Sequence, residues 1–133
     1  MEDVGKPQGQ TPVYSFVLAC YRYIEMNPVR AGMVGHPREY RWSSYRVNAE
    51  GRRDRLITPH ADYTRLGRSE DSRRESYRSL FKTHLNPEIV ADIRRATNGN
   101  YVLGSKRFQE EISRMLQRRV VPGKSGRPVK TDK

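Results

Sequence analysis

The chain has 133 residues, a formal net charge of +11, and a hydrophobic fraction of 35%. This length fits one domain with a modest core, and the cationic excess points to a polyanionic partner, most simply nucleic acid. We expect neither a membrane span nor a signal peptide, and the single Cys20 excludes an internal disulfide and fits the reducing cytoplasm.

Residues 1–13 are polar and rich in Gly, Pro and Gln, which predicts disorder. Apolar spacing over Val13–Met26 predicts a helix. Pro28 is expected to end this helix, with Asn27 capping a short following turn that Gly32 closes. Helical periodicity places one set of residues on a common face: Phe16, Cys20, Tyr23, Ile24 and Asn27.

The next segment alternates basic and aromatic residues. Arg41, Trp42 and Arg46 are typical of a nucleic-acid surface, because arginine pairs with phosphates and aromatic rings stack on bases. The alternative interpretation is that Trp42 and Tyr45 form the core of a small helical corner. The pattern by itself leaves both interpretations open.

Cap signals predict four further helices, which begin at Thr58 with Pro59, at Ser69, at Asn86 with Pro87, and at Ser105. A basic loop over Gly51–Arg55 precedes these helices. The arginines of the helix that begins at Ser69 are expected on a solvated face. The last two, joined through 98–104, form either a helix-turn-helix or a plain helical hairpin. In the last helix, the stripe expected to be buried is Phe108, Ile112, Met115 and Leu116.

Residues 120–133 are basic and rich in Pro and Gly, which predicts a flexible tail. Its tripeptide Gly126–Pro128 resembles the centre of an AT-hook, in which Arg127 enters the minor groove. The alternative is a solvated tail with nonspecific phosphate contacts. Lys106 and Arg107, which open the last helix, are further predicted DNA contacts. The expected fold class is mainly α: about five helices between a disordered N-terminus and a basic tail.

A set of short motifs resembles the REP-associated tyrosine transposases, which are relatives of the single-tyrosine HUH transposases. The resemblance covers roughly residue 14 to the C-terminus, and the ordered set is more specific than any one motif. The motifs, in family order, are Cys20–Gly32, Tyr40–Tyr45, Thr58–His60, Asn98–Gly99, Leu103–Ser105 with Phe108, Arg118–Val120 and Gly126–Pro128.

In this family a tyrosine hydroxyl attacks single-stranded DNA and forms a 5′-phosphotyrosine. A Mg²⁺ or Mn²⁺ ion, held mainly by a His-x-His pair, polarises the phosphate. The resemblance implies that Tyr23 is the nucleophile and Asn27 the auxiliary metal ligand, with Arg22 and Arg30 as flanking DNA contacts. It also implies a single-stranded DNA hairpin as partner and a homodimer. No membrane partner is expected, because the sequence contains no long apolar run.

The histidine pair is missing from this sequence. His36, His60 and His84 are isolated and all follow Tyr23, which only 22 residues precede. We therefore expect a truncated transposase that lacks most of the α/β HUH sheet, and that by itself binds no metal and cleaves no strand. The expected organisation is 1–13 outside the family, 14–35 as the remnant carrying the tyrosine helix, 36–119 as the C-terminal helical region, and 120–133 as the tail.

Three functions remain open. The chain is a degenerate transposase that binds DNA, a fragment that lends Tyr23 to an intact partner, or a small basic helical regulator that binds duplex DNA or RNA without transposition chemistry. In the first two cases the apolar face formed by Phe16, Cys20 and Ile24 has lost its sheet. We expect that face to fold back, to self-associate, or to stay poorly ordered.

Overall fold

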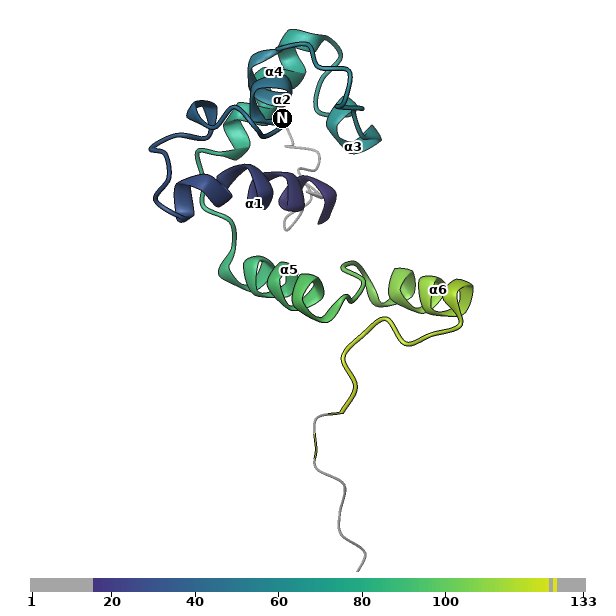
Figure 1. Ribbon diagram of the computed structural model, residues 1–133. Coiled ribbons are helices and arrows are strands. Elements are labelled where there is room, and N and C mark those ends of the chain that lie inside the picture. Colours follow the sequence, from purple (N-terminus) through teal and green to yellow (C-terminus); the bar gives the residue numbers. More distant parts are fainter. Residues whose placement is uncertain (1–15, 125, 127–133) are drawn as a thin grey trace, which may run out of the picture. The chain divides into compact units, whose positions relative to one another are not determined.

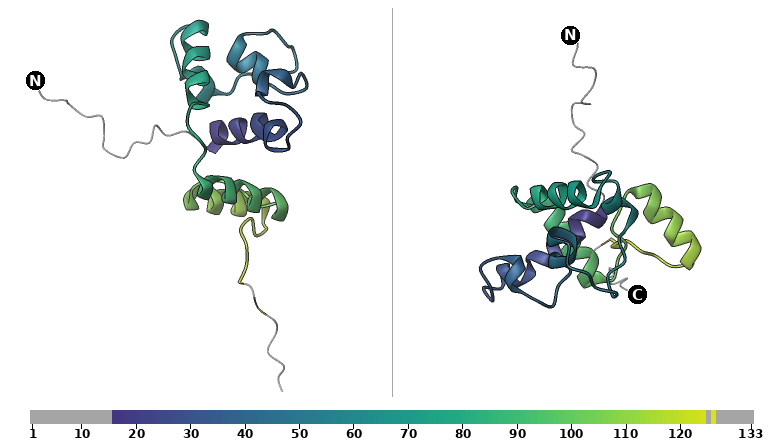
Figure 2. Two further views of the ribbon diagram at one scale, coloured as in Figure 1. Left: turned by 90° about the vertical axis from the view of Figure 1, so that its left-hand side faces the viewer. Right: turned by 90° about the horizontal axis from the view of Figure 1, so that it is seen from above.

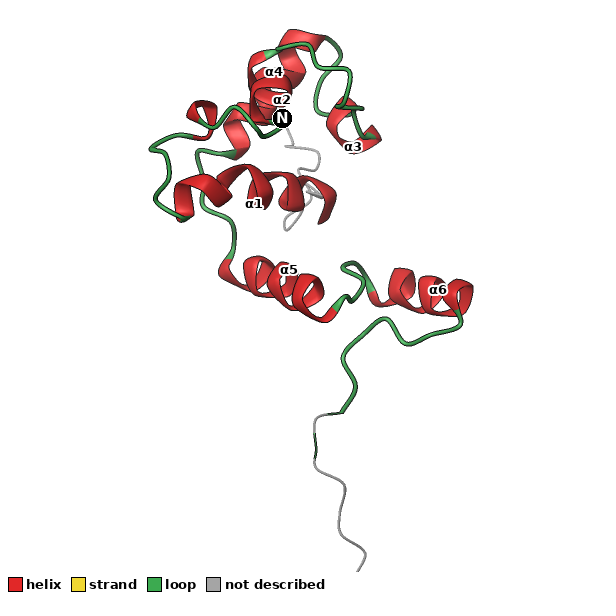
Figure 3. Cartoon of the chain, viewed as in Figure 1, coloured by secondary structure: helices red, strands yellow, loops and turns green. Residues whose placement is uncertain are grey.

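The computed structural model describes residues 16–124 and Gly126; the predicted disordered segment 1–13 and Arg127 lie outside the described residues. The described part is mainly helical and contains no strand (Figure 1, Figure 3). Its six α-helices exceed the five expected. In chain order the elements are α1 (Phe16–Arg30), the 3₁₀ turn η1 (Pro37–Glu39), α2 (Tyr45–Glu50), α3 (Ala61–Thr64), α4 (Glu70–Leu80), α5 (Pro87–Gly99) and α6 (Lys106–Leu116).

The chain divides into two compact units, Met1–Ile89 and Val90–Lys133. In the first, α1 lies along one side of the group formed by α2, α3 and α4 (Figure 1, Figure 2). The rings of Tyr63 and Tyr77 meet edge to face at 5.4 Å, and those of Tyr45 and Phe81 at 5.1 Å, a favoured aromatic arrangement. The core of this unit consists of Leu18, Tyr45, Ala49, Tyr63, Tyr77 and Leu80.

The prediction that Pro28 ends the first helix is wrong. Helix α1 continues through a buried Pro28 to Arg30. Proline lacks the amide hydrogen that the helix would use at this position, but only two residues of α1 follow it. The predicted stop at Gly32 is confirmed: its φ is +71°, and the amides of Gly32 and Met33 donate to the carbonyls of Val29 (3.0 Å) and Pro28 (2.9 Å), forming a Schellman end.

Of the three outcomes open for the apolar face of α1, folding back onto the other helices is not the one observed for Phe16 and Ile24. Phe16 and Ile24 are 41% and 56% exposed. The helix instead buries the adjacent face, because the charged side chains of Arg22 and Glu25 find partners there. The predicted apolar face is therefore only partly covered by the described residues, and its Cys20 is half-buried. The buried residues of α1 are Leu18, Ala19, Arg22, Glu25 and Pro28.

The predicted start of a helix at Thr58 with Pro59 is also wrong. Helix α3 begins at Ala61, and His60 is its N-cap, because the imidazole Nδ1 accepts a hydrogen bond from the Asp62 amide at 3.0 Å. The imidazole acceptor thus satisfies one of the amides that a helix start leaves without an intrahelical partner.

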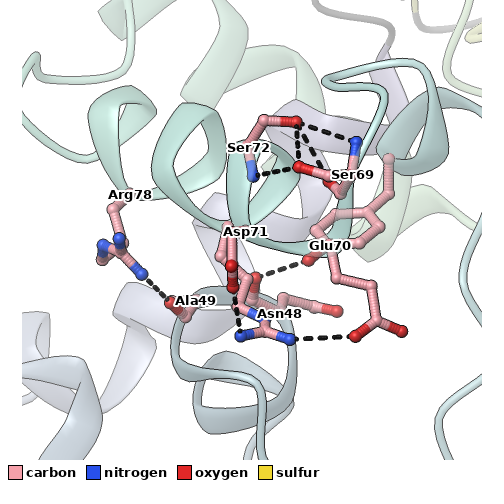
Figure 4. Close-up of polar contacts among 9 residues, drawn as sticks. Asn48, Ala49, Ser69, Glu70, Asp71, Ser72 and Arg78 are labelled. Carbon is pink, nitrogen blue, oxygen red and sulfur yellow. Dashed lines mark hydrogen bonds and ion pairs between the residues drawn. The ribbon is translucent and has the colours of Figure 1, made fainter.

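The cap predicted at Ser69 is confirmed. Its hydroxyl accepts from the Ser72 amide at 3.1 Å, and the Ser72 hydroxyl in turn accepts from the Ser69 amide at 3.0 Å (Figure 4). This reciprocal pair satisfies two amides at the start of α4.

In the second unit, Ser105 caps α6 as predicted, accepting from the Phe108 amide at 3.2 Å. The expected burial of the α6 stripe is wrong for three of its four residues: Phe108, Met115 and Leu116 are 45%, 72% and 53% exposed, whereas Ile112 is half-buried. Helices α5 and α6 contact each other too sparsely for a compact helix-turn-helix or a packed hairpin.

The predicted tail begins with an ordered residue. Val120 is 1% exposed, and its carbonyl accepts from the Val102 amide at 2.9 Å. The chain leaving α6 is thus anchored to the segment that enters it.

Candidate nucleic-acid interface

Tyr23, Asn27 and Arg30 form a cluster at the C-terminal end of α1. The Arg30 guanidinium donates to the Asn27 side-chain oxygen and to the Tyr23 carbonyl. Its Cζ also lies 4.3 Å from the centroid of the Tyr23 ring. These residues are four and three apart, so the helix places them on one face. The structure therefore brings Tyr23, Asn27 and Arg30 together, and Asn27 bonds Arg30 instead of capping a turn.

The donors around Tyr23 do not fit a Mg²⁺ or Mn²⁺ ion. The Asn27 oxygen already accepts from a guanidinium, and a second cation beside Arg30 would be repelled. His36 and His60 use Nδ1 to accept from the backbone amides of Arg38 (3.1 Å) and Asp62 (3.0 Å). Residues 16–124 bring together no cluster of three or more His, Cys, Asp or Glu side chains suited to a metal.

Arg22, predicted as a DNA contact, lies in the interior. It is 7% exposed, its guanidinium donates to the Thr83 carbonyl, and its Cζ lies 5.9 Å from the centroid of the Phe81 ring. Burial of a cation requires such partners, because an isolated charge loses its hydration. Arg22 therefore links α1 to the end of α4 and is not a surface cation.

Trp42 and Tyr45 have different environments, so the two interpretations of their segment, a nucleic-acid surface and the core of a helical corner, each apply to one residue. Tyr45 is 3% exposed and belongs to the core, whereas Trp42 is 74% exposed. The guanidinium of Arg41 lies over the indole, with Cζ 4.2 Å from the ring centroid. The Arg41–Trp42 pair thus presents a large aromatic surface beside a positive charge, at the turn that leads into α2.

Arg46 supports this turn from α2. Its Nε donates to the Arg38 carbonyl at 2.7 Å, while Arg38 lies 3.8 Å from the Glu50 carboxylate. Both Nη groups of Arg46 have no hydrogen-bond partner within the part of the chain that the structure describes. One edge of the guanidinium is structural, and the other edge is available to a ligand.

Lys106 and Arg107 are exposed in the first turn of α6, where the positive end of the helix dipole adds to their charge. They lie in the second unit, whereas the Arg41–Trp42 pair lies in the first.

A buried carboxylate at the centre of the first unit was missed in the sequence. Glu25 is 0% exposed; its Oε1 accepts from the Ser44 hydroxyl (2.6 Å) and the Asn48 amide (2.9 Å), and its Oε2 from the Tyr77 hydroxyl (2.5 Å). Burial raises the pKa of Glu25, and these three hydrogen bonds act against that rise. Burial and the neighbouring carboxylate also raise the pKa of Tyr77. No periodicity of α1 signals these partners, because they come from α2 with its N-cap and from α4, which follow later in the chain.

No family model, curated protein or solved structure matches this chain. Among the described residues, no helix has the length and apolar character needed to cross a membrane. The function is therefore inferred from the residues and their geometry.

Proposed function

We propose that this chain is a transposase-like DNA-binding protein of the cytoplasm, which holds single-stranded DNA hairpins and does not cleave them by itself. The single observation that carries the proposal is the Arg41–Trp42 pair. An indole that is 74% exposed and covered on one side by a guanidinium offers its surface to an unpaired base and its charge to a phosphate.

Two further features support DNA as the partner. The net charge of +11 favours a polyanion, and exposed cations also occur in the second unit at Lys106 and Arg107. The ordered motifs shared with REP-associated tyrosine transposases point to single-stranded hairpins, because those enzymes act on such DNA. Stacking on an exposed aromatic ring also requires unpaired bases.

The absence of cleavage is proposed from the chemistry around Tyr23. A phenol that attacks a phosphodiester needs an electrophile to stabilise the developing charge, and the family uses a metal bound by paired histidines. Here the Asn27 oxygen is bonded to Arg30, and the three histidines of the sequence are far apart along the chain. If Tyr23 acted in the active site of an intact partner protein, the contacts among Tyr23, Asn27 and Arg30 would have to change.

Binding of a fluorescent DNA hairpin, followed by anisotropy, tests the proposal. Replacing Trp42 with alanine should weaken binding by about 5- to 150-fold, since stacking of one base is worth ~1–3 kcal/mol. Leu56→Ala is the matched control, because Leu56 is an 89% exposed apolar side chain of the same unit.

Equal losses in the two variants would overturn the role of Trp42. Equal affinity for a duplex of the same sequence would favour the small duplex-binding regulator. In Mn²⁺ the hairpin should remain free of covalent protein on a denaturing gel. An adduct that forms with the wild type and disappears in Tyr23→Phe would contradict the proposal.

A further inference from the structure

A depression of about 730 Å³ lies in the first unit, where the chain leaves α2. Its lining includes Arg52, Arg53 and Arg55 from the segment between α2 and α3, and Arg73 and Arg74 from α4. The two groups are about twenty residues apart in the sequence, and the fold brings them to one cavity. A volume of several hundred Å³ is typical of a site that holds a small ligand or a segment of a larger one.

Most of this positive charge has no carboxylate partner. Arg74 pairs with Glu70 at 3.2 Å and with Asp71 at 3.1 Å. The other four arginines form no ion pair with any residue the structure describes, and Arg73 makes only a long 3.4 Å contact to a carbonyl. Asp54, the other acid in the lining, accepts from the Leu56 amide at 2.9 Å. The depression therefore carries a net positive charge that a bound anion would compensate.

The backbone beneath the depression is held in place by side chains from α3 and α4. The Asn48 carbonyl accepts from the Tyr63 hydroxyl at 2.7 Å, and the Ala49 carbonyl accepts from Arg78 at 2.5 Å (Figure 4). Gly51 then turns the chain with φ +73°, and a Cβ there would lie 2.5 Å from the Arg74 Cζ. Glycine adopts this left-handed turn without strain, and it also leaves room for the guanidinium of Arg74.

We propose that this depression binds phosphodiester groups of the same DNA strand whose bases stack on Trp42. Arginine presents a planar fork of donors that matches phosphate oxygens, and four guanidinium groups without carboxylate partners favour more than one phosphate. Trp42 precedes α2 and Arg52 follows it, and a helix of six residues is ~9 Å long. One DNA strand can therefore reach both the Trp42 ring and the depression. The inference rests on the proposed DNA-binding function and names a second contact surface for it.

The test compares two triple variants with equal loss of charge in the same unit. One is Arg52→Gln/Arg53→Gln/Arg55→Gln; the control is Arg65→Gln/Arg68→Gln/Lys82→Gln, whose exposed side chains do not line the depression. The first should weaken hairpin binding by about 10-fold or more, and reduce the slope of log K against log salt by about 2, since each lost phosphate contact of a single strand contributes ~0.7. The control should lose less than about 3-fold, because screened charges away from the strand act weakly.

The remaining outcomes separate this inference from the function on which it rests. If the wild type binds the hairpin and both triple variants bind equally well, the depression is not a contact surface, and the Trp42 surface stands. If the wild type shows no salt-dependent hairpin binding, the proposed function and this inference both fall. A third outcome is that the first variant binds the hairpin as the wild type does but no longer binds ATP, which the wild type and the control do bind. This outcome would show that the depression binds a free nucleotide and not a DNA strand. Matching thermal unfolding of both variants and the wild type establishes that all are folded. Arg73→Gln should weaken hairpin binding in the wild type and in the control background, because Arg73 lines the same depression.

Discussion

Glu25 is the residue on which the packing of the first unit depends most directly. Its carboxylate is fully buried and accepts from Ser44, Asn48 and Tyr77, so it connects α1 with the start of α2, with α2 itself, and with α4. No buried polar side-chain atom of the described residues lacks a hydrogen-bond partner. A fully satisfied polar centre favours one arrangement of the helices, because other arrangements leave its groups unpaired.

Removal of this carboxylate should destabilise the protein strongly. Glu25→Ala leaves two hydroxyls and an amide without their acceptor, at a cost of about 3 kcal/mol or more in the free energy of unfolding. Glu25→Gln keeps the shape and one acceptor oxygen, so its cost should be much smaller. Urea denaturation measures both, and equal stability of the alanine and glutamine variants would show that the hydrogen bonds of Glu25 do not hold the unit together.

The stability difference between the wild type and Glu25→Gln should depend on pH, and its sign can be predicted. Because burial raises the pKa of Glu25 in the folded state, the folded state binds its proton more tightly than the unfolded state does. The stabilisation from this group is complete below the ordinary carboxyl pKa and is lost as the pH rises through the raised value. The stability of Glu25→Gln relative to the wild type should therefore increase from pH 4 towards neutrality, and a decrease would contradict the raised pKa.

At the scale of elements, the helix ends of the first unit depend on left-handed glycines. Gly32 ends α1 with φ +71°, and Gly51 ends α2 with φ +73°. The two positions differ in their surroundings: a Cβ at Gly32 would meet nothing within 4 Å, whereas one at Gly51 would lie 2.5 Å from the Arg74 guanidinium. Alanine at Gly32 therefore introduces backbone strain alone, whereas alanine at Gly51 introduces both backbone strain and a close contact with Arg74.

Alanine at either glycine should lower stability by about 1 kcal/mol, because a left-handed conformation is strained once a Cβ is present. Gly51→Ala should cost more than Gly32→Ala, since Arg74 must also leave its ion pairs with Glu70 and Asp71. The difference is expected to be small, because exposed ion pairs are weak. Chemical denaturation of the two variants measures it, and a larger loss at Gly32 would contradict the role given to Arg74.

At the scale of the whole molecule, burial is unevenly divided between the units. The first contains the connected core with its tyrosines and Glu25. Of the described hydrophobic residues of the second, only Ile93 and Val120 are buried, and the apolar stripe of α6 is exposed. Local stability follows buried apolar contacts, so the two units should not open with the same free energy.

Hydrogen exchange should show this difference directly. Amides of α2 and α4 should exchange on the order of 100-fold more slowly than those of α6, after correction for intrinsic rates. Addition of the DNA hairpin should slow exchange in the segment around Arg52 and Arg53 if the strand lies in the depression. Equal protection of all helices in the free protein would show that α6 is covered, for example by self-association of its exposed stripe.

The candidate site was predictable only in part. Arg41 and Trp42 were identified from adjacent basic and aromatic residues, but their exposure depended on which aromatic residue entered the core. Arg22 has the same local pattern as a surface cation, yet it is buried because the Thr83 carbonyl and the Phe81 ring lie beside it. The basic loop that lines the depression is evident in the sequence. The sequence does not show that the loop meets the arginines of α4, because helical periodicity places those arginines only on a helix surface.

The sequence by itself determined the helical class, the caps at Ser69 and Ser105, the stop at Gly32 and the cationic character, because each depends on residues within one turn of the chain or on composition alone. Only the tertiary structure decided which face of α1 is buried. Hydrophobicity favours the side with Phe16 and Ile24, but Glu25 gains three donors that lie 19, 23 and 52 residues away along the chain. Partners at such separations outweigh local periodicity, because a buried charge is stable only where the fold supplies its hydrogen bonds.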